Sequence, residues 1–251
     1  MTRKEKILEI AQHEGRVLVE RLADDLSVSS HTIRRDINAL CKEAKLRRLH
    51  GGAEFIDSSR NVAYDTRSVL NLENKRAIAE KAAGLVHDGA TVFLSVGTTP
   101  ALVAEALAGR DRLTLITNNL NAAMAAAANP DHRIIVPGGE VRLPDRDFVS
   151  ETAVGLFSRY RADFAVFGVG GIDSDGSLLD FHETEVRLRQ QMRRNSRCAV
   201  LVADHTKFGR RAAAVGGDMN DADIVVIDCL PGPAFVPVFN ELSAQLLVAQ
   251  A

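Results

Sequence analysis

The sequence predicts a two-part α/β protein, in which a small helical unit with a short β-wing precedes a larger domain built on a mostly parallel sheet. Two observations support this division. Residues 1–56 contain short apolar helical patterns separated by glycine and serine turns. From residue 73 onward, continuous apolar runs alternate with helical patterns, which is typical of a sheet covered on both faces. We therefore expect units at 1–56 and 73–251, joined by a linker at 57–72.

Composition narrows the class of protein. The 251 residues carry a formal net charge of −2, with 46% hydrophobic and 25% charged residues, which is ordinary for a soluble protein. Cys41, Cys198 and Cys229 are far apart, so the sequence predicts neither disulfides nor a metal site. The first residues lead into an amphipathic helix instead of a signal peptide, and no apolar run reaches transmembrane length. We expect a cytoplasmic protein with no membrane partner.

The first unit is predicted to contain three short helices. Residues 6–13 and 19–26 each carry an apolar stripe at helical spacing. A third helix follows a serine-rich turn, where Ser29 or Ser30 can cap it by accepting a bond from a backbone N–H group. The buried stripe of this helix is expected at spacings of four and three residues: Ile33, Ile37 and Leu40.

Basic residues gather on this third helix and just after it. Arg34 and Arg35 lie on its predicted solvent side, and a basic strand over 46–49 with a hairpin or hinge at 51–52 would form a wing beside it. From residue 29 to 48, six basic residues stand against two acidic ones. An arginine pair alone is typical of an ordinary solvated helix, but the preceding helices and the wing favour a winged helix-turn-helix that docks in a DNA major groove. The predicted DNA contacts are Ser29, Ser30, His31, Thr32, Arg34, Arg35, Asn38, Arg47, Arg48 and His50.

The second domain alternates strands and helices. Strands are predicted at 91–94, 113–117, 133–136, 163–168, 198–203 and 224–228. Helices are predicted at 73–86, 100–107, 121–128, 151–157 and 183–194. Because the strands are apolar throughout, we expect a parallel sheet with helices on both faces.

Polar, glycine-containing turns follow several of these strands, at the edge where parallel α/β sheets bind ligands. They lie at 95–100, 117–119, 137–140, 168–173 and 204–209. In the first turn, Gly97 allows the backbone to approach a ligand, and Thr98 and Thr99 offer hydroxyl and amide donors suited to phosphate. Lys207 in the last turn could neutralise a phosphate. Each feature alone also fits a capped turn or a surface lysine, but their convergence at one edge favours a ligand site.

The first unit resembles the DeoR family of bacterial regulators. The motifs that carry the resemblance are Val17-x-Val19-x-x-Leu22-Ala23, Val28-Ser29, Thr32-Ile-Arg-Arg-Asp36, Leu40 and Arg48-x-His50-Gly-Gly-Ala53. The resemblance covers the whole unit and implies DNA binding. Ala44 departs from the pattern, since the family usually has Gly or Asn there, before the wing.

The second domain resembles the sensor domain of the same family, which is related to sugar-phosphate isomerases. The resemblance is strongest over Gly171-Ile-Asp-Ser-Asp-Gly-Ser-Leu-Leu-Asp180, Glu185-Val-Arg187 and Asp204-His-Thr-Lys-Phe-Gly-Arg210. It implies that Gly97, Thr98 and Thr99 hold the phosphate of an inducer, with glycerol 3-phosphate as the first candidate. Ser95, Ser150 and His182 depart from the family pattern. The effector-site candidates are Ser95, Gly97, Thr98, Thr99, Asn118, Asn119, Gly170, Asp173 and Lys207.

We therefore hypothesise a repressor of a carbon-metabolism operon that leaves double-stranded operator DNA when a phosphorylated metabolite binds, with no cofactor. Two-fold symmetry suits palindromic operators, so a homodimer or the homotetramer common in the family is expected. One alternative senses a different sugar phosphate. A second is an isomerase-like enzyme with an appended helix-turn-helix, although its acid/base candidates Asp173, Glu183, Glu185 and Asp204 form no distinctive catalytic pattern. In a third, the second domain only oligomerises.

Overall fold

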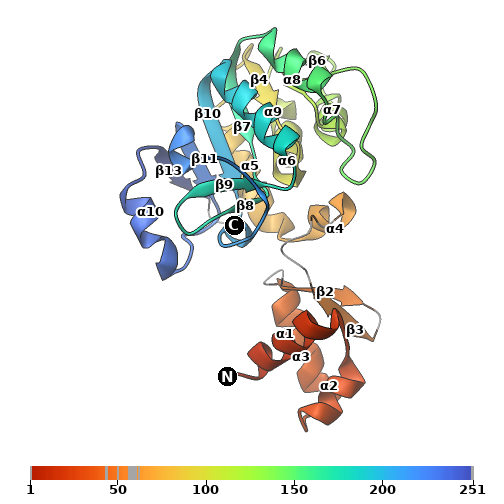
Figure 1. Ribbon diagram of the computed structural model, residues 1–251. Helices are drawn as coiled ribbons and strands as arrows, with labels where there is room; N and C mark the ends of the chain where they lie inside the picture. The colour runs from red at the N-terminus through yellow and green to blue at the C-terminus, as the bar shows by residue number, and fades with distance from the viewer. Residues whose placement is uncertain (1, 43–44, 50, 56–60, 62, 250–251) are drawn as a thin grey trace. The chain divides into compact units, whose positions relative to one another are not determined.

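The computed structural model describes residues 2–42, 45–49, 51–55, 61 and 63–249 (Figure 1). It divides the chain into two compact units, Met1–Val62 and Ala63–Ala251. Each unit has its own hydrophobic core, as the sequence predicts.

The first unit packs helices against a small antiparallel sheet. The helices are α1 (Arg3–Glu14), α2 (Val19–Asp25) and α3 (Ser30–Lys42). The strands are β1 (Arg16–Leu18), β2 (Leu46–Leu49) and β3 (Gly52–Phe55), in the order β1-β3-β2. The predicted helices and the wing are confirmed, with Ile33 and Ile37 fully buried and Leu40 2% exposed. The sequence did not predict β1, because a three-residue strand with one buried side chain is too short to show a period.

Local chemistry explains where these elements begin and end. Thr2 and Glu5 form a reciprocal capping box at the start of α1, and Gly15 ends that helix with a φ of +76°. Gly51 lies in the turn of the β2–β3 hairpin and Gly52 begins β3, which agrees with the prediction of a hairpin at this point instead of a hinge. A Cβ on Gly52 would lie 2.1 Å from the carbonyl oxygen of Val17, so the close approach of β1 and β3 requires glycine.

The second unit is built on a parallel sheet, which confirms the predicted architecture. As described, its strands are β4 (Thr91–Leu94), β5 (Thr114–Thr117), β6 (Arg133–Ile135), β7 (Ala162–Phe167), β10 (Ser196–Ala203), β12 (Ile224–Ile227) and β13 (Gln245–Val248). They run in the order β13-β12-β10-β7-β4-β5-β6, and every pair is parallel. The carboxyl ends of the strands therefore lie at one edge.

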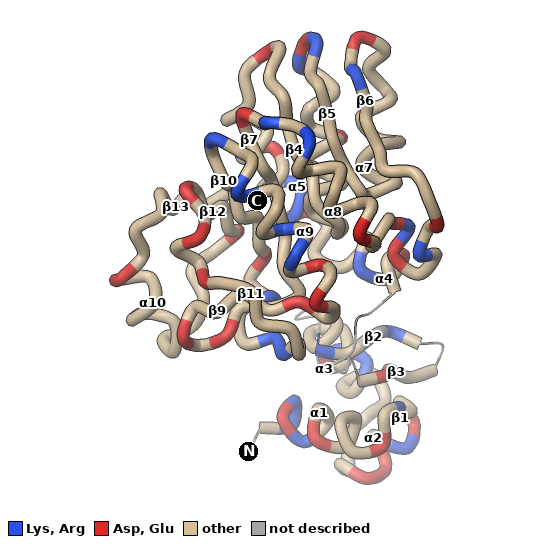
Figure 2. Tube along the Cα trace, turned by 45° about the horizontal axis from the view of Figure 1, so that its top comes forward, with Lys and Arg blue, Asp and Glu red and all other residues tan. Residues whose placement is uncertain are grey.

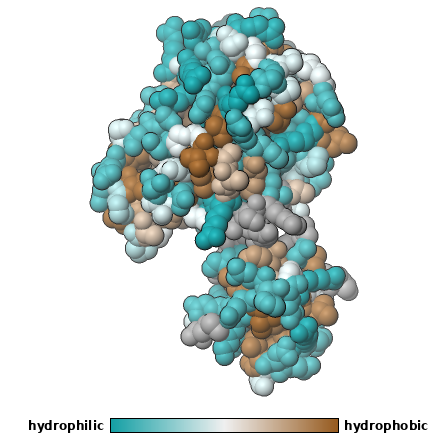
Figure 3. Space-filling model, in the orientation of Figure 1, coloured by the Kyte–Doolittle hydropathy of each residue, from teal (hydrophilic) through white to brown (hydrophobic). Residues whose placement is uncertain are grey.

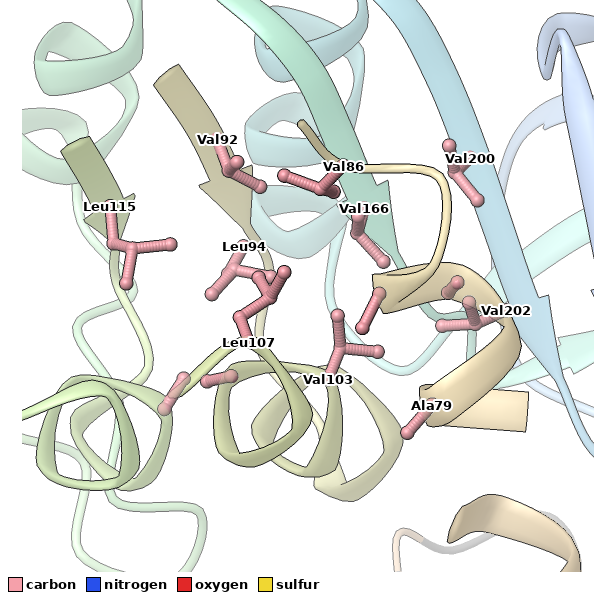
Figure 4. Packing of buried hydrophobic residues seen from close by; sticks show 14 of the residues in the cluster. Ala79, Val86, Val92, Leu94, Val103, Leu107, Leu115, Val166, Val200 and Val202 are labelled. Carbon is pink, nitrogen blue, oxygen red and sulfur yellow. The ribbon is translucent and has the colours of Figure 1, made fainter. Parts of the chain in front are cut away.

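Helices cover both faces of this sheet. One face packs against α5 (Leu72–Ala83), α6 (Thr98–Ala106), η1 (Leu107–Gly109) and α7 (Leu120–Ala126). Figure 4 shows this core, where Val92, Leu94 and Val166 from the strands meet Val103 and Leu107. The other face packs against α8 (Glu151–Ser158) and α9 (Glu183–Arg194), through residues such as Phe157 and Met192.

A small antiparallel sheet lies outside the predicted pattern. Its strands are β8 (Gly171–Ile172), β9 (Ser177–Asp180) and β11 (Ala214–Asp218), in the order β11-β9-β8. These strands are short, and β8 and β11 contain glycine, so they lack the long apolar run that marked the others. The remaining short elements are η2 (His205–Lys207), η3 (Met219–Asp221), η4 (Pro233–Phe235) and α10 (Val236–Asn240).

Part of the predicted linker is helical. The segment expected to be a linker at 57–72 contains α4 (Tyr64–Val69), and α5 begins at its last residue. Both helices belong to the second unit, and Tyr64 is 8% exposed. The sequence showed no periodicity here, because a six-residue helix with one buried side chain is too short to show a regular spacing of apolar residues.

The surface carries charges of both signs on both units (Figure 2). Figure 3 shows that the face of the second unit turned to the viewer is mostly hydrophilic, with hydrophobic residues in small separate areas. Among the described residues, no helix combines the length and the apolar character that a membrane crossing requires.

Candidate functional site

The helix α3 presents its predicted DNA contacts to solvent. His31, Arg34, Arg35 and Asn38 are exposed, and Thr32 is half-buried. The apolar stripe of α3 packs into the core, so these side chains leave the helix on the side that a major groove could receive.

Four predicted contacts, namely Ser29, Ser30, Thr32 and Arg34, already have side-chain partners among the described residues of the unit. Ser29 caps α3, because its Oγ accepts the Thr32 N–H at 3.2 Å. Ser30 Oγ donates to one carboxylate oxygen of Glu20 at 2.7 Å, and Arg34 donates to the other at 3.3 Å. Arg35 has no hydrogen bond or ion pair to any described residue. The two adjacent arginines are therefore not equivalent.

The wing carries further predicted DNA contacts, and α1 contributes a side chain that holds α3 in place. Arg48 is exposed on β2. Arg47 also lies in β2, but its side chain is outside the described residues, as are His50 and Ala44. Asp36, which the sequence analysis did not select, is 4% exposed and accepts from Arg3 Nε at 2.5 Å. This pair ties α1 to α3 and so fixes how α3 sits on the core.

In the second unit, the loop after β4 is the first candidate phosphate site. Gly97 has a φ of +120° and precedes α6 without a capping side chain, so the first N–H groups of the helix have no side-chain acceptor. Thr98 and Thr99 are 7% and 5% exposed, and no described residue hydrogen-bonds to their hydroxyls. Ser95 Oγ accepts the Gly168 N–H at 3.2 Å and so joins this loop to the one after β7. An anion at the start of α6 would find backbone donors and hydroxyls together.

The two asparagines after β5 have different roles. Asn119 Nδ2 donates to the carbonyl oxygens of Ser95 and Gly97 at 3.2 and 2.9 Å, and its Oδ1 caps α7. Its side chain therefore shapes the Gly97 loop and has no free donor to offer. Asn118 donates to the Phe148 carbonyl at 3.0 Å, and its buried Oδ1 has no hydrogen-bond partner. Asn118 thus keeps an acceptor available.

Gly170 and Asp173 serve the small sheet. The Gly170 N–H donates to Asp180 Oδ1 at 2.9 Å, and a Cβ on this glycine would lie 2.9 Å from the Leu179 carbonyl oxygen. Asp173 is exposed, and its carboxylate accepts the N–H of Ser174 at 2.7 Å. No described hydrogen bond joins either residue to the Gly97 loop. Their place near the ligand, which the family resemblance implied, has no support from these contacts.

Basic side chains from three segments lie near Asp204 and Lys207 at the carboxyl edge. We call them the cation cluster: Arg67 of α4, Lys75 of α5, and Lys207 and Arg210 after β10. Asp204 is 1% exposed; its Oδ1 accepts the Thr206 N–H at 3.0 Å, and its buried Oδ2 has no hydrogen-bond partner. The site therefore combines excess positive charge with a free acceptor.

The cations and Asp204 shift one another's pKa values. Burial lowers the pKa of Lys207 well below its usual value, with Arg210 adding to the effect and Asp204 opposing it. Burial also lowers the pKa of Lys75, and it lowers that of Arg210 to about 10. Burial alone would raise the pKa of Asp204, but Lys207 and Lys75 outweigh it, and the pKa is lowered. A bound anion would relieve the repulsion among the cations.

A strap formed by residues 141–148 joins α4 to the loop after β5. Its Phe148 N–H donates to the Asn118 carbonyl at 2.8 Å. The Tyr64 N–H of α4 donates to the Pro144 carbonyl at 3.2 Å, and Arg67 forms an ion pair with Asp145. Since Arg67 also belongs to the cation cluster, α4 connects the strap with the carboxyl edge of the sheet.

One group of side chains in the described part of the chain could hold a metal ion. His205 Nδ1 lies 2.5 Å from Asp228 Oδ2, and this hydrogen bond raises the pKa of His205. Together with Cys229, these side chains place their ligand atoms within 4.8 Å of one another.

Comparison with known proteins decides the family. Residues 3–59 match the DeoR-like helix-turn-helix domain, and residues 70–229 match the DeoR C terminal sensor domain. The chain belongs to the DeoR family. It is 40% identical over 240 residues to the glycerol-3-phosphate regulon repressor of Escherichia coli (strain K12), covering 96% of this chain and 95% of that protein.

The chain is also similar to a second transcriptional repressor and, more distantly, to a solved enzyme structure. The DeoR-family chain is 35% identical over 248 residues to the HTH-type transcriptional repressor CsqR of Escherichia coli (strain K12), covering 99% of this chain and 95% of that protein. Among solved structures, ribose 5-phosphate isomerase A from Methanocaldococcus jannaschii is 21% identical and covers 55% of each chain, with a TM-score of 0.41.

This DeoR-family protein is a transcriptional regulator with a DNA-binding unit and a small-molecule sensor domain. The prediction of a regulator instead of an enzyme is confirmed, because the relatives are transcriptional regulators. The alternative in which the second domain only oligomerises gives way to a sensor, since that domain matches a sensor domain.

Sequence reasoning missed most of the cation cluster. Lys75 did carry a signal, because it lies three residues before Ile78 and four before Ala79, on the buried stripe of α5, where a lysine is rare. Arg67 carried none, since nothing in the sequence marked α4. Asp204 was considered only as an acid/base candidate for the enzyme alternative.

Proposed function

We propose that this DeoR-family regulator is a repressor of a carbon-metabolism operon, and that a phosphorylated metabolite releases it from its operator. The observation that supports the proposal most is the cation cluster, in which the buried Asp204 carboxylate interacts with Lys75, Lys207 and Arg210, and Arg67 adds a fourth positive charge beside Lys207 and Arg210. The exposed side of α3, with Arg35 unpaired among the described residues, is the surface offered to double-stranded DNA.

The chemistry of the edge favours a ligand with both a phosphate and a hydroxyl group. The cation cluster and the start of α6 attract the phosphate. The free Oδ2 of Asp204 is an acceptor whose burial without a partner is costly, and an aliphatic hydroxyl can satisfy it. Glycerol 3-phosphate carries both groups, and a 40% identical relative is named for the regulon of that compound. A different sugar phosphate is the second candidate, because it carries the same two groups.

Control of DNA binding requires two states that the ligand distinguishes. We propose a homodimer or homotetramer whose paired α3 helices match operator half-sites in one state only. The ligand then needs a coupling free energy of about 1–3 kcal/mol to change occupancy. Arg67 is placed to transmit it, because α4 contacts the strap and the cation cluster and follows directly on the first unit.

Calorimetry on the full chain tests the ligand. We expect saturable binding and a higher melting temperature with glycerol 3-phosphate, and neither effect with glycerol. Inorganic phosphate should bind more weakly, because it leaves Asp204 unsatisfied. If ribose 5-phosphate binds and glycerol 3-phosphate does not, the result favours the second candidate, a different sugar phosphate. If no phosphorylated compound produces heat at millimolar concentration, the sensing proposal fails.

A DNA-binding assay tests whether the ligand releases the protein from its operator. A duplex that the protein selects from a random library serves as operator in fluorescence anisotropy. We expect the ligand identified by calorimetry to weaken binding to this duplex by about tenfold or more, as the coupling range requires. If the ligand binds but the affinity for DNA does not change, the proposed release from the operator is wrong, whereas the proposed ligand site stands.

A further inference from the structure

A second group of donor atoms lies beside the cation cluster at the carboxyl edge. His205 opens η2 after β10, and Asp228 and Cys229 follow β12, which pairs with β10 in parallel. His205 Nδ1, a carboxylate oxygen of Asp228 and Cys229 Sγ all lie within 4.8 Å of one another. Three donors of different chemistry therefore come within reach of a single ion.

We propose that His205, Asp228 and Cys229 form a transition-metal site and that Zn²⁺ is the ion that fits it best. Imidazole nitrogen, carboxylate oxygen and thiolate sulfur are the donors that Zn²⁺ takes in proteins, at about 2.0–2.3 Å. Ligand atoms of a tetrahedral ion at such distances are separated by less than about 4 Å, which the observed spacing approaches. Three protein ligands leave a fourth position for water or for an oxygen of another molecule.

The surroundings orient the Asp228 carboxylate in advance. Asp228 is 7% exposed; its Oδ2 accepts from Asn74 Nδ2 at 2.8 Å, and its Oδ1 accepts the His205 N–H at 2.7 Å. Such outer partners fix ligand geometry and support affinity. Cys229 is exposed, so an ion can reach the group from solvent.

Binding requires a small rearrangement and a defined proton balance. His205 Nδ1 and Asp228 Oδ2 lie 2.5 Å apart, closer than two ligands of one ion, so the ion takes the place of the hydrogen between them. An imidazolium at His205 gives its Nδ1 proton to solvent and binds as the neutral form with its proton on Nε2, and the Cys229 thiol proton also passes to solvent. Thiolate and carboxylate together balance the charge of a divalent ion.

The site stands next to the proposed effector contacts. His205 follows Asp204 directly, and η2 also contains Lys207. An ion would therefore anchor the short turn that supplies two of those contacts. The cysteine pattern of the sequence could not predict the site, because one of its ligands comes from the end of a different strand.

Cobalt absorption tests the proposal on the reduced full-length protein. Co²⁺ replaces Zn²⁺ at such sites and gives a thiolate charge-transfer band when sulfur is a ligand. We expect one Co²⁺ per chain with this band, which added Zn²⁺ should remove. Cys229→Ser should abolish the band, whereas the matched control Cys198→Ser, a thiol in β10, should keep it. A wild-type chain without the band, or a band that survives Cys229→Ser, overturns the site.

Two further measurements do not depend on the spectrum. Loss of an outer partner typically weakens metal binding by about 10–100-fold, so His205→Ala should weaken Zn²⁺ binding in equilibrium dialysis by about 100-fold or more. Zn²⁺ should also protect Cys229, but not Cys41, from alkylation, as peptide mass spectrometry can show. Undiminished Zn²⁺ binding by a folded His205→Ala, or equal alkylation with and without Zn²⁺, contradicts the proposal.

Discussion

Two neighbouring arginines on α3 show how residues of the same type acquire different roles. Arg34 is held 3.3 Å from a carboxylate oxygen of Glu20, whereas Arg35 has no partner among the described residues. The sequence presents them as an equivalent pair, because Glu20 lies fourteen residues earlier, on another helix. Glu20 thus reduces the charge that Arg34 offers to DNA and leaves that of Arg35 unchanged.

Substitutions at these positions should have opposite effects on operator binding. Arg35→Ala should weaken it by about 1–3 kcal/mol, the usual loss for an arginine contact. Glu20→Gln should strengthen it several-fold, because it frees Arg34 and removes a negative charge, while a pair this exposed stabilises the fold little. Fluorescence anisotropy measures both affinities, with thermal unfolding as the control for folding. Weaker binding by Glu20→Gln would show that Glu20 orients Arg34 instead of masking it.

Lys75 is the residue whose burial most directly indicates a ligand. It is 5% exposed, and its Nζ donates to the Arg67 carbonyl at 2.7 Å. Lys75→Met keeps most of the length of the side chain and removes its charge. We expect effector affinity to fall by about tenfold or more, as for the loss of a hydrogen bond to a charged group, while DNA affinity without effector stays the same.

Calorimetry with glycerol 3-phosphate and anisotropy with operator DNA measure the two affinities of Lys75→Met. Lys81→Met, at an exposed position of the same helix, is the matched control and should bind the effector as the wild type does. Equal effector affinity in both variants would remove Lys75 from the site.

At the scale of elements, the sequence predicted what was long or periodic. The apolar strands and the amphipathic helices of both units were correct in type, because each buries enough side chains to show a period. The elements that the sequence did not predict include β1, β8, β9, β11, β13 and α4, which are short and are held by contacts with residues far away in the sequence. For example, β9 is held to α9 by an ion pair between Asp180 and Arg189 at 2.9 Å. Sequence periodicity contains no information about such a pair.

Breaking this ion pair should destabilise the second unit. Asp180 and Arg189 are 7% and 4% exposed, and Arg189 also donates to the Gly216 carbonyl of β11 at 2.7 Å. Asp180→Asn leaves a buried guanidinium without its counter-ion, which costs about 3–5 kcal/mol. Urea unfolding should show the loss as a lower midpoint. The control Glu183→Gln, at an exposed position of α9, should unfold as the wild type does, and an unchanged midpoint for Asp180→Asn would contradict the assigned role.

At the scale of the whole molecule, the sequence located the carboxyl edge of the sheet, where we propose that the ligand binds, but not the full set of side chains there. Parallel strands place their carboxyl ends together, so the turns after β4, β5, β7 and β10 could be assigned to one edge in advance. The contacts that the side chains make at this edge could not be predicted in the same way. Asn119 is occupied with shaping the Gly97 loop, Asp173 makes only local contacts, and Arg67 and Lys75 arrive from helices outside those turns.

The charge distribution of the molecule predicts a strong effect of salt on operator binding. The chain has a net charge of −2, yet residues 29–48 carry six basic residues against two acidic ones. Binding should therefore release counter-ions locally, and the logarithm of the affinity should fall linearly with the logarithm of salt concentration, by about 0.9 per phosphate contact. Anisotropy between about 50 and 200 mM salt measures the slope. Arg35→Ala should make it shallower, and a slope of zero would exclude phosphate contacts by α3.

The helix α4 has a consequence for building new regulators from this one. Its Tyr64 is buried, and its Arg67 pairs with Asp145 of the strap, so α4 is part of the sensor and not of the connection. A foreign DNA-binding module should therefore be fused between residues 62 and 63, where the two units divide. A fusion made after residue 72 would discard the helix through which we propose that the sensor communicates, and the resulting hybrid should bind its target sequence without responding to any metabolite.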